Sequence, residues 1–275
     1  MPDVKQIYRR PLGMLDHLGD ELRFYLAAIA ATPRTIRRYK KEILRLLAEV
    51  TLGSGALAVI GGTVGVITAM AFFTGTEVGL QGYASLNQIG TAAFSGFVSA
   101  YFNTREISPL IAGIALAATV GCGFTAQLGA MRISEEVDAL EVMAIPSMPF
   151  LVATRVIGGL IAIVPLYVVG LLSSYFASRL VVTQFYGQSA GTYDHYFNQF
   201  LPPGDVLWSF GKVLVFAVVV ILIHCYHGYT ASGGPAGVGV AVGRAVRTSI
   251  VAINVIDLFL SMAIWGSTTT VRLAG

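Results

Sequence analysis

Charged residues are scarce in this sequence. Asp, Glu, Lys and Arg make up 12% of its 275 residues, whereas hydrophobic residues make up 55%. The mean hydropathy is +0.71, and soluble globular domains usually carry about 25% charged residues. So little charge cannot cover the surface of an ordinary soluble domain. The composition predicts an all-α polytopic membrane protein.

The sequence has few cysteines, and we recognise no secretory signal peptide in it. The two cysteines, Cys122 and Cys225, lie in apolar surroundings, which favours small buried side chains over a disulfide framework. The first 49 residues are polar and basic, and they contain no short apolar core followed by a small-residue cleavage site. We therefore expect a retained N-terminal segment on the cytoplasmic side.

Catalytic motifs are missing from the sequence as well. It has no G-x-x-x-x-G-K-[ST] phosphate loop, because the glycine-rich run Gly237–Gly243 lacks both the lysine and a preceding strand. It has no H-E-x-x-H and no G-x-S-x-G motif, and its acidic residues match no EF-hand loop. We expect a chain that is not an enzyme and that binds no metal and no cofactor itself.

Long runs without charge are what the sequence does contain. They cover 50–76, 78–104, 107–131, 156–178, 213–243 and, interrupted by Asp257, 248–271. Each could supply the roughly 20 apolar residues of a spanning helix. The run 78–104 is only mildly apolar, so we expect residues 82–104 to lie along the outer leaflet, to re-enter the membrane or to begin a broken helix.

The prediction is therefore five spans within a single domain, 1–275. They are expected at about 51–75, 107–129, 150–178, 206–228 and 248–270. The positive-inside tendency places the N-terminus in the cytoplasm and the C-terminus outside.

Basic residues gather at the N-terminal end, where ten of the eighteen Lys and Arg residues precede Thr51. Thr32 and Pro33 would cap and open an amphipathic helix over 32–50. Such a helix would lie in the membrane interface with its basic side toward lipid phosphates. The alternative is a solvated helix. We expect 1–50 to form a cytoplasmic or interfacial helical segment and 51–275 the transmembrane bundle.

Five charges fall within ten positions at 132–141, between two apolar runs. Ser134 could cap a short helix that ends before Pro146. Its first turn would carry Glu135 and Glu136, and its apolar side Val137, Leu140 and Ala144. A helix of about eleven residues is not stable alone in water, so it would dock and present its acidic side to a cytoplasmic partner. A plain solvated loop and a divalent-cation site are the alternatives.

Several motifs resemble those of one family. The stretch 129–146 is similar to the G-x-M-R-x-T/S-E-Q/E signature of the MlaE/YrbE family, which comprises permease subunits of ABC transporters that move lipids. Further similar blocks follow the family's order: Gly79–Tyr83, Arg105–Pro109, Gly228–Tyr229, Ala236–Gly239 and Arg247. The stretch Thr119–Gln127 lacks an Arg and a Glu that the family often has there. The chain is most similar to B-type YrbE subunits of actinobacterial Mce systems.

The resemblance implies a permease driven by a separate ABC ATPase dimer that would use ATP and Mg²⁺. Residues 133–145 would be the cytoplasmic coupling helix between the second and third spans. The implied ATPase contacts are Arg132, Ser134, Glu135, Glu136, Asp138, Leu140 and Glu141. The implied lipid pocket lies near the outer end of the first span, with Phe72, Phe73, Val78, Leu80 and Tyr83 as its candidate lining.

The implied partners are an A-type YrbE paralogue, with a homodimer as the alternative, and a hexamer of Mce-domain proteins. The cargo would be a fatty acid, a mycolic-type lipid or a sterol, imported across the cytoplasmic (inner) membrane. No nucleic acid is expected as a partner.

Ionisable residues also occur within the predicted spans. Asp257 and Lys212 lie inside spans, and Arg105 and Glu106 stand at the start of another. Such residues are functional candidates because charge is costly in the membrane. One interpretation is a structural ion pair of Asp257 and Lys212 with each other or with Arg105 or Arg155. The other is a secondary transporter driven by an ion gradient, with Asp257 as the carrier.

Overall fold

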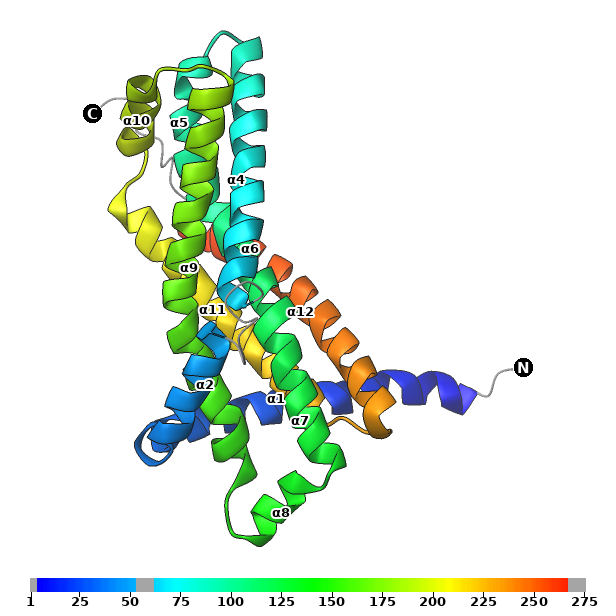
Figure 1. Ribbon diagram of the computed structural model, residues 1–275. Helices are drawn as coiled ribbons and strands as arrows, with labels where there is room; N and C mark the ends of the chain where they lie inside the picture. The colour runs from blue at the N-terminus through cyan, green and yellow to red at the C-terminus, as the bar shows by residue number, and fades with distance from the viewer. Residues whose placement is uncertain (1–3, 53–61, 267–275) are drawn as a thin grey trace.

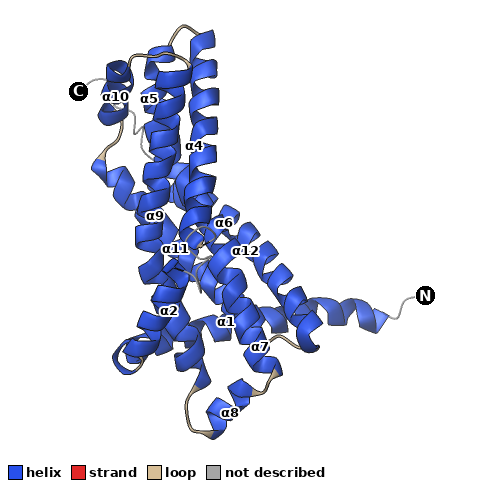
Figure 2. Cartoon of the chain, viewed as in Figure 1, coloured by secondary structure: helices blue, strands red, loops and turns tan. Residues whose placement is uncertain are grey.

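The computed structural model describes residues 4–52 and 62–266. These residues form helices and contain no strand (Figure 2). In chain order the elements are α1 (Val4–Arg38), α2 (Lys40–Leu52), α4 (Thr63–Gln88), η1 (Ala92–Phe94), α5 (Ser95–Val98), η2 (Ser99–Ile107), α6 (Ser108–Leu116), η3 (Ala117–Gly121), α7 (Cys122–Ile133), α8 (Glu136–Val142), η4 (Met148–Ala153), α9 (Thr154–Leu180), η5 (Val181–Phe185), α10 (Ala190–Gln199), α11 (Pro203–Tyr229) and α12 (Gly234–Trp265). The expected all-α fold is confirmed.

Five continuous helical stretches are long and apolar enough to cross a membrane. They are Thr63–Gln88, Ala92–Ile133, Met148–Phe185, Pro203–Tyr229 and Gly234–Trp265. The predicted number of spans is confirmed. The prediction placed the start of the first span at about residue 51. Among the described residues this span begins at Thr63, and residues 53–61 lie outside them.

Residues 82–104 do not form a separate segment. They are divided between the end of α4 and the beginning of the second spanning stretch, with a short turn at Ile89–Thr91 in which Gly90 has a φ of 72°. Of the three predicted arrangements, the beginning of a broken helix agrees best, because residues 92–104 open a long helical stretch that π-helical segments interrupt. The second stretch is one helical path of 42 residues, about 63 Å long, which is longer than the roughly 30 Å of a hydrocarbon core.

That long stretch includes two π-helical segments, η2 and η3. The first ends immediately before Ser108–Pro109, where proline supplies no backbone N–H for the regular helical pattern. A π-helical turn accommodates such a local mismatch without ending the helix. The stretch therefore continues as a helix. The wider turns around Arg105 rotate the side chains that follow relative to those of a regular α-helix.

Small residues hold the first span against the third. A Cβ atom added to Gly75 would lie 2.4 Å from the carbonyl oxygen of Ser174, and one added to Gly79 would lie 3.0 Å from that of Ser178. The Ser178 hydroxyl also donates a hydrogen bond of 2.6 Å to the carbonyl oxygen of Gly75. Close approach of small residues is the usual basis of helix packing in membranes. It fixes which face of α4 is covered by α9.

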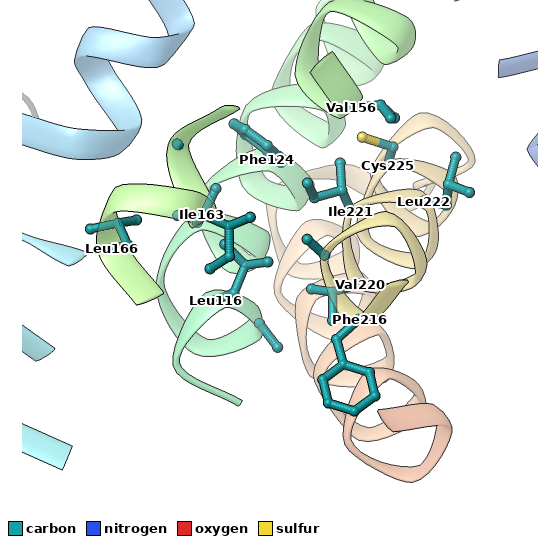
Figure 3. Close-up of a cluster of buried hydrophobic side chains, with 14 of the residues drawn as sticks. Leu116, Phe124, Val156, Ile163, Leu166, Phe216, Val220, Ile221, Leu222 and Cys225 are labelled. Carbon is teal, nitrogen blue, oxygen red and sulfur yellow. The ribbon is translucent and has the colours of Figure 1, made fainter. Parts of the chain in front are cut away.

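The apolar core lies where the second, third and fourth spanning stretches meet (Figure 3). Leu116 and Phe124 from the second stretch pack with Ile163 and Leu166 of α9. The fourth stretch contributes Phe216, Val220 and Ile221, all fully buried. This core fixes the relative positions of the polar groups described below.

The N-terminal segment forms a longer helix than predicted. Helix α1 continues through Thr32, whose hydroxyl donates to the carbonyl oxygen of Ala28 four residues earlier, so the predicted helix start at Thr32 is wrong. The helix breaks at Tyr39 instead, and α2 follows. Figure 1 shows α1 lying across the lower end of the bundle. Phe24 packs its ring against those of Tyr226 and Tyr229 at the end of α11.

Candidate functional site

The acidic stretch lies outside the spanning helices. It forms α8, which connects α7 to η4 and projects at the end of the bundle where α1 lies (Figure 1). Turns on both sides separate α8 from the neighbouring helices. The short helix is therefore a protruding element of the surface and not part of a span.

The ends of α8 differ from the prediction. Ser134 does not cap this helix, because its hydroxyl contacts the carbonyl oxygen of Ala130 at 3.0 Å and the Glu136 carboxylate at 2.9 Å. Glu135 takes the N-cap position in the left-handed region, with a φ of 60°. Ala144 also has a positive φ, 57°, so the helix stops before Pro146 and has seven residues.

One side of α8 docks as expected. Val137 is buried, and Leu140 packs against the core cluster. Ala144 is exposed, so its assignment to the buried side is wrong, because the helix has already ended there. Sequence reasoning missed Val142 and Met143, which are 87% and 61% exposed. Exposed large apolar side chains beside carboxylates are typical of a protein contact surface.

The acidic residues of this stretch fall into two groups. Glu141 accepts hydrogen bonds from the backbone N–H and the hydroxyl of Ser147, and these bonds hold the pKa of its carboxyl below the usual range. The same Ser147 hydroxyl lies 2.8 Å from the Tyr229 hydroxyl, which ties the segment to α11. Asp138 pairs at 2.6 Å with Arg132 on the surface. Glu141 therefore positions the loop, whereas Glu136 and Asp138 remain exposed on the helix.

A second group of charges is buried between the spans. The side chain of Lys212 on α11 is fully buried, and its Nζ lies 2.6 Å from Asp257 Oδ1 and 3.2 Å from Glu106 Oε2. It also donates to the Arg105 carbonyl oxygen at 2.6 Å and to the Ser261 hydroxyl at 2.8 Å. The predicted ion pair of Lys212 with Asp257 is confirmed, and it joins three spanning stretches.

Arg105 binds a residue that the sequence did not single out. Its Nε and Nη2 atoms lie 2.8 and 2.6 Å from Asp205 Oδ2, and the Trp265 indole donates to Asp205 Oδ1 at 3.0 Å. The guanidinium also lies over the Tyr101 ring, 4.2 Å from its centroid. Asp205, in the first turn of α11 after two prolines, carried a weak helix-start signal.

The structure gives the candidate lipid-pocket residues different neighbours. Val78 lines a groove of about 350 Å³ between α4 and the start of the second stretch, together with Gly82, Leu86, Val98 and Phe102. Tyr83 stacks instead on Tyr186, with ring centroids 4.2 Å apart, and the Leu80 carbonyl oxygen accepts a bond from the same tyrosine at 3.5 Å. Phe73 is 70% exposed and lies against Phe72.

The departure from the family motif also has a structural counterpart. Gln127, where the family often has a carboxylate, accepts a hydrogen bond of 3.2 Å from Arg155 Nη2. Arg155 also donates to the carbonyl oxygen of Leu151 and lies over the Phe124 ring. A neutral amide thus serves as an acceptor for a buried guanidinium. Among the described residues, no group of three or more His, Cys, Asp and Glu side chains could hold a metal ion.

These features define a class of protein: a multi-pass helical membrane protein with a buried charged cluster between its spans and an acidic helix exposed at one end. The model of the family described as Permease MlaE matches residues 53–263. The chain belongs to this family.

Curated relatives agree with this assignment. The chain is 29% identical over 94% of its length to a "probable ABC transporter permease protein" of Rickettsia bellii, with 96% of that relative covered. It is 32% identical over 72% of its length to TRIGALACTOSYLDIACYLGLYCEROL 1, a chloroplastic protein of Arabidopsis thaliana, with 57% of that protein covered. It is 26% identical over 74% of its length to the intermembrane phospholipid transport system permease protein MlaE of Haemophilus influenzae, with 78% covered.

Proposed function

We propose that this chain is a transmembrane, non-catalytic permease subunit of an ABC transporter that moves lipids across the inner membrane. Its membership in the MlaE permease family supports this role, as do relatives named for ABC transport and for phospholipid transport. The chain acts as one domain, and a separate ATPase dimer hydrolyses ATP with Mg²⁺.

We further propose that the transporter is of the Mce type and imports its cargo. In this assignment the chain is a B-type YrbE subunit, pairs with an A-type paralogue and lies below a hexamer of Mce-domain proteins. The motif order and the Gln127 substitution support the assignment. The cargo is a fatty acid, a mycolic-type lipid or a sterol. The N-terminus lies in the cytoplasm and the C-terminus outside.

The observation that carries the mechanism is the exposed surface of α8. Its carboxylates can form ion pairs with a basic cleft, and the neighbouring Val142 and Met143 can enter apolar pockets there. The buried Val137 and the bonds of Glu141 to Ser147 hold α8 against the spans. Closure of the ATPase dimer would thus push on α8 and shift α7 and η4, which enter the bundle.

A charge-reversal experiment tests this function. Replacing Glu136 and Asp138 by lysine should release the ATPase and abolish lipid-stimulated ATP hydrolysis, while the thermal stability of the spans stays unchanged. The matched control is Asn198→Lys with Gln199→Lys, which adds positive charge to exposed positions on α10 at the other end of the bundle. Unchanged recovery of the ATPase with the α8 variant would contradict the proposal.

The alternative, a secondary transporter with Asp257 as ion carrier, is less well supported. Asp257 is buried beside the fully buried Lys212 in a cluster that joins three spanning stretches. Loss of either partner would leave an uncompensated charge inside the bundle, so a structural role accounts for this pair. Gradient-driven uptake by the purified chain without ATP would favour the alternative.

A further inference from the structure

A polar cavity lies at the end of the bundle where α8 projects (Figure 1). Its volume is about 520 Å³, within the range of about 300–1,000 Å³ that small-molecule sites usually have. Helices α2, α7, α8 and α9 and the η4 segment supply its walls. All the candidate lipid-pocket residues lie on α4, and none of the described residues of α4 lines this cavity. The cavity is therefore separate from the candidate lipid pocket.

Arg155 supplies a cation whose orientation is fixed. This residue, in the first turn of α9, is 6% exposed and lines the cavity. Its guanidinium donates to the carbonyl oxygen of Leu151 at 2.7 Å and to Gln127 Oε1 at 3.2 Å. It also lies over the Phe124 ring, 5.5 Å from the ring centroid. A guanidinium held in this way suits phosphate oxygens, because its N–H groups form a rigid planar fork.

Side chains of both charges line the cavity. Helix α2 supplies Arg45 and Glu42, whose charged groups lie 3.9 Å apart, and α8 supplies Glu136. An anion by itself would be close to the two carboxylates, and a cation by itself would be close to Arg45 and Arg155. A ligand that carries both a phosphate and an ammonium group can pair with all four side chains. The cavity therefore favours a zwitterionic ligand.

The surroundings of the cavity favour a lipid over a soluble zwitterion. Leu46, Met131 and Phe150 also line it, and these apolar side chains can contact the glycerol backbone and the first acyl carbons of a lipid. Helix α2 exposes Lys40 and Lys41 while it buries Leu46. A basic amphipathic helix of this kind lies at the level of lipid phosphates. A headgroup can thus reach the cavity from the membrane surface.

We infer that this cavity binds the headgroup of a zwitterionic phospholipid, with its phosphate at Arg45 and Arg155 and its primary ammonium at Glu42 and Glu136. Such a lipid joins α2 to α8 from the cytoplasmic leaflet, as a bound component of the protein and not as its cargo. The inference goes beyond the proposed function and rests on it only for the orientation that places this end of the bundle in the cytoplasm.

Lipid titration tests the chemistry of the site. The full-length protein, purified with its partners and stripped of lipid, is titrated with micelles that contain phosphatidylethanolamine or phosphatidylglycerol, and binding is followed by native mass spectrometry. Phosphatidylethanolamine should bind at least about tenfold more tightly, because phosphatidylglycerol lacks the ammonium group and its charge-assisted hydrogen bonds. Equal affinity for the two lipids would overturn the inference.

The soluble headgroup, glycerophosphoethanolamine, separates the two possible sources of the ligand. It should bind at least about tenfold more weakly than phosphatidylethanolamine, because it has no acyl chains to contact the apolar side of the cavity. Equal affinity for the soluble headgroup and the lipid would show that the ligand is a soluble zwitterion, and it would overturn the inference.

Two variants with matched controls locate the site. Ala130→Leu places a larger side chain in the cavity, and Ala126→Leu makes the same change one turn earlier on α7, outside the cavity. Arg45→Gln removes a proposed phosphate contact, and Lys41→Gln removes a neighbouring charge that does not line the cavity. All four residues are exposed, so thermal stability should stay unchanged. Affinity for phosphatidylethanolamine should fall at least about tenfold in the two cavity variants and less than about twofold in the controls. Unchanged affinity in either cavity variant would overturn the inference.

A photoreactive phenylalanine analogue at Met131 identifies what fills the cavity in the native membrane. It should form an adduct with a phospholipid that contains a primary amine. An adduct with the ATPase, or the absence of any lipid adduct, would overturn the inference. Lipid binding without recovery of an ATPase would leave the inference standing and contradict the proposed function. Recovery of an ATPase with no lipid binding would do the reverse.

Discussion

The two charged regions of this protein differ in how deeply their charges are buried. In the buried cluster, Lys212 has two carboxylate neighbours and two oxygen acceptors, and Arg105 has a carboxylate and two aromatic rings. On α8, the carboxylates of Glu136 and Asp138 are exposed next to the apolar Val142 and Met143. Buried charges paired within the chain maintain the fold. Exposed charges beside exposed apolar residues, including the surface pair of Asp138 with Arg132, are accessible to a partner.

Removal of the central cation should have the largest effect. Lys212→Met leaves the buried Asp257 and the partly exposed Glu106 without their shared cation, which should cost about 3–5 kcal/mol of stability. Thermal unfolding of the purified protein in detergent measures this loss. The control is Arg244→Met, an exposed basic residue of α12, which should change stability by less than about 0.5 kcal/mol.

A triple variant distinguishes loss of charge balance from loss of packing. Adding Asp257→Asn and Glu106→Gln to Lys212→Met should recover part of the lost stability, because the buried charges are then gone. If Lys212→Met is as stable as the Arg244→Met control, the cluster does not maintain the fold.

Changes on α8 should affect coupling and leave stability intact. Val142→Ser with Met143→Ser removes two exposed apolar side chains, so the free energy of unfolding should change by less than about 0.5 kcal/mol. Recovery of the ATPase should fall at least about tenfold if these residues are anchors in its surface. Phe185→Ser, at an exposed residue near the other end of the bundle, serves as the control. Equal recovery from both variants would contradict the contrast between the two regions.

The smallest effect should appear in the pH dependence of the α8 connection. Hydrogen bonds from Ser147 lower the pKa of Glu141 in the folded protein. Their stabilisation is therefore present above the ordinary glutamate pKa of about 4.3 and is lost as the pH falls through the lowered value. The thermal midpoint of wild type should exceed that of Glu141→Gln near neutral pH, and the difference should shrink in acid. A difference that does not change with pH would contradict this role of Glu141.

Much of the fold follows from patterns along the chain. Charge-free runs predicted the five spans, because the bilayer imposes the same length requirement on each. The pair of Lys212 with Asp257 was also foreseeable, since intramembrane charges need partners. Asp205 and Trp265 were missed because their contact with Arg105 depends on the tertiary arrangement of three spans.

Local boundaries were harder to predict than the number of spans. Thr32 and Ser134 both suggested helix starts, yet each hydroxyl donates to the preceding turn of its own helix instead. Serine and threonine can make either bond, and sequence does not distinguish them. For residues 82–104 the sequence left three arrangements open, because polar residues at the end of a long helix resemble those of a separate segment.

The most direct test of coupling through α8 is to purify this chain from its native membrane through a C-terminal tag and to identify its partners by mass spectrometry. The account predicts an ABC ATPase among them, lost when Glu136 and Asp138 are changed to lysine. Recovery of the wild-type chain without any ATPase, in a form that takes up lipid without ATP, would contradict it.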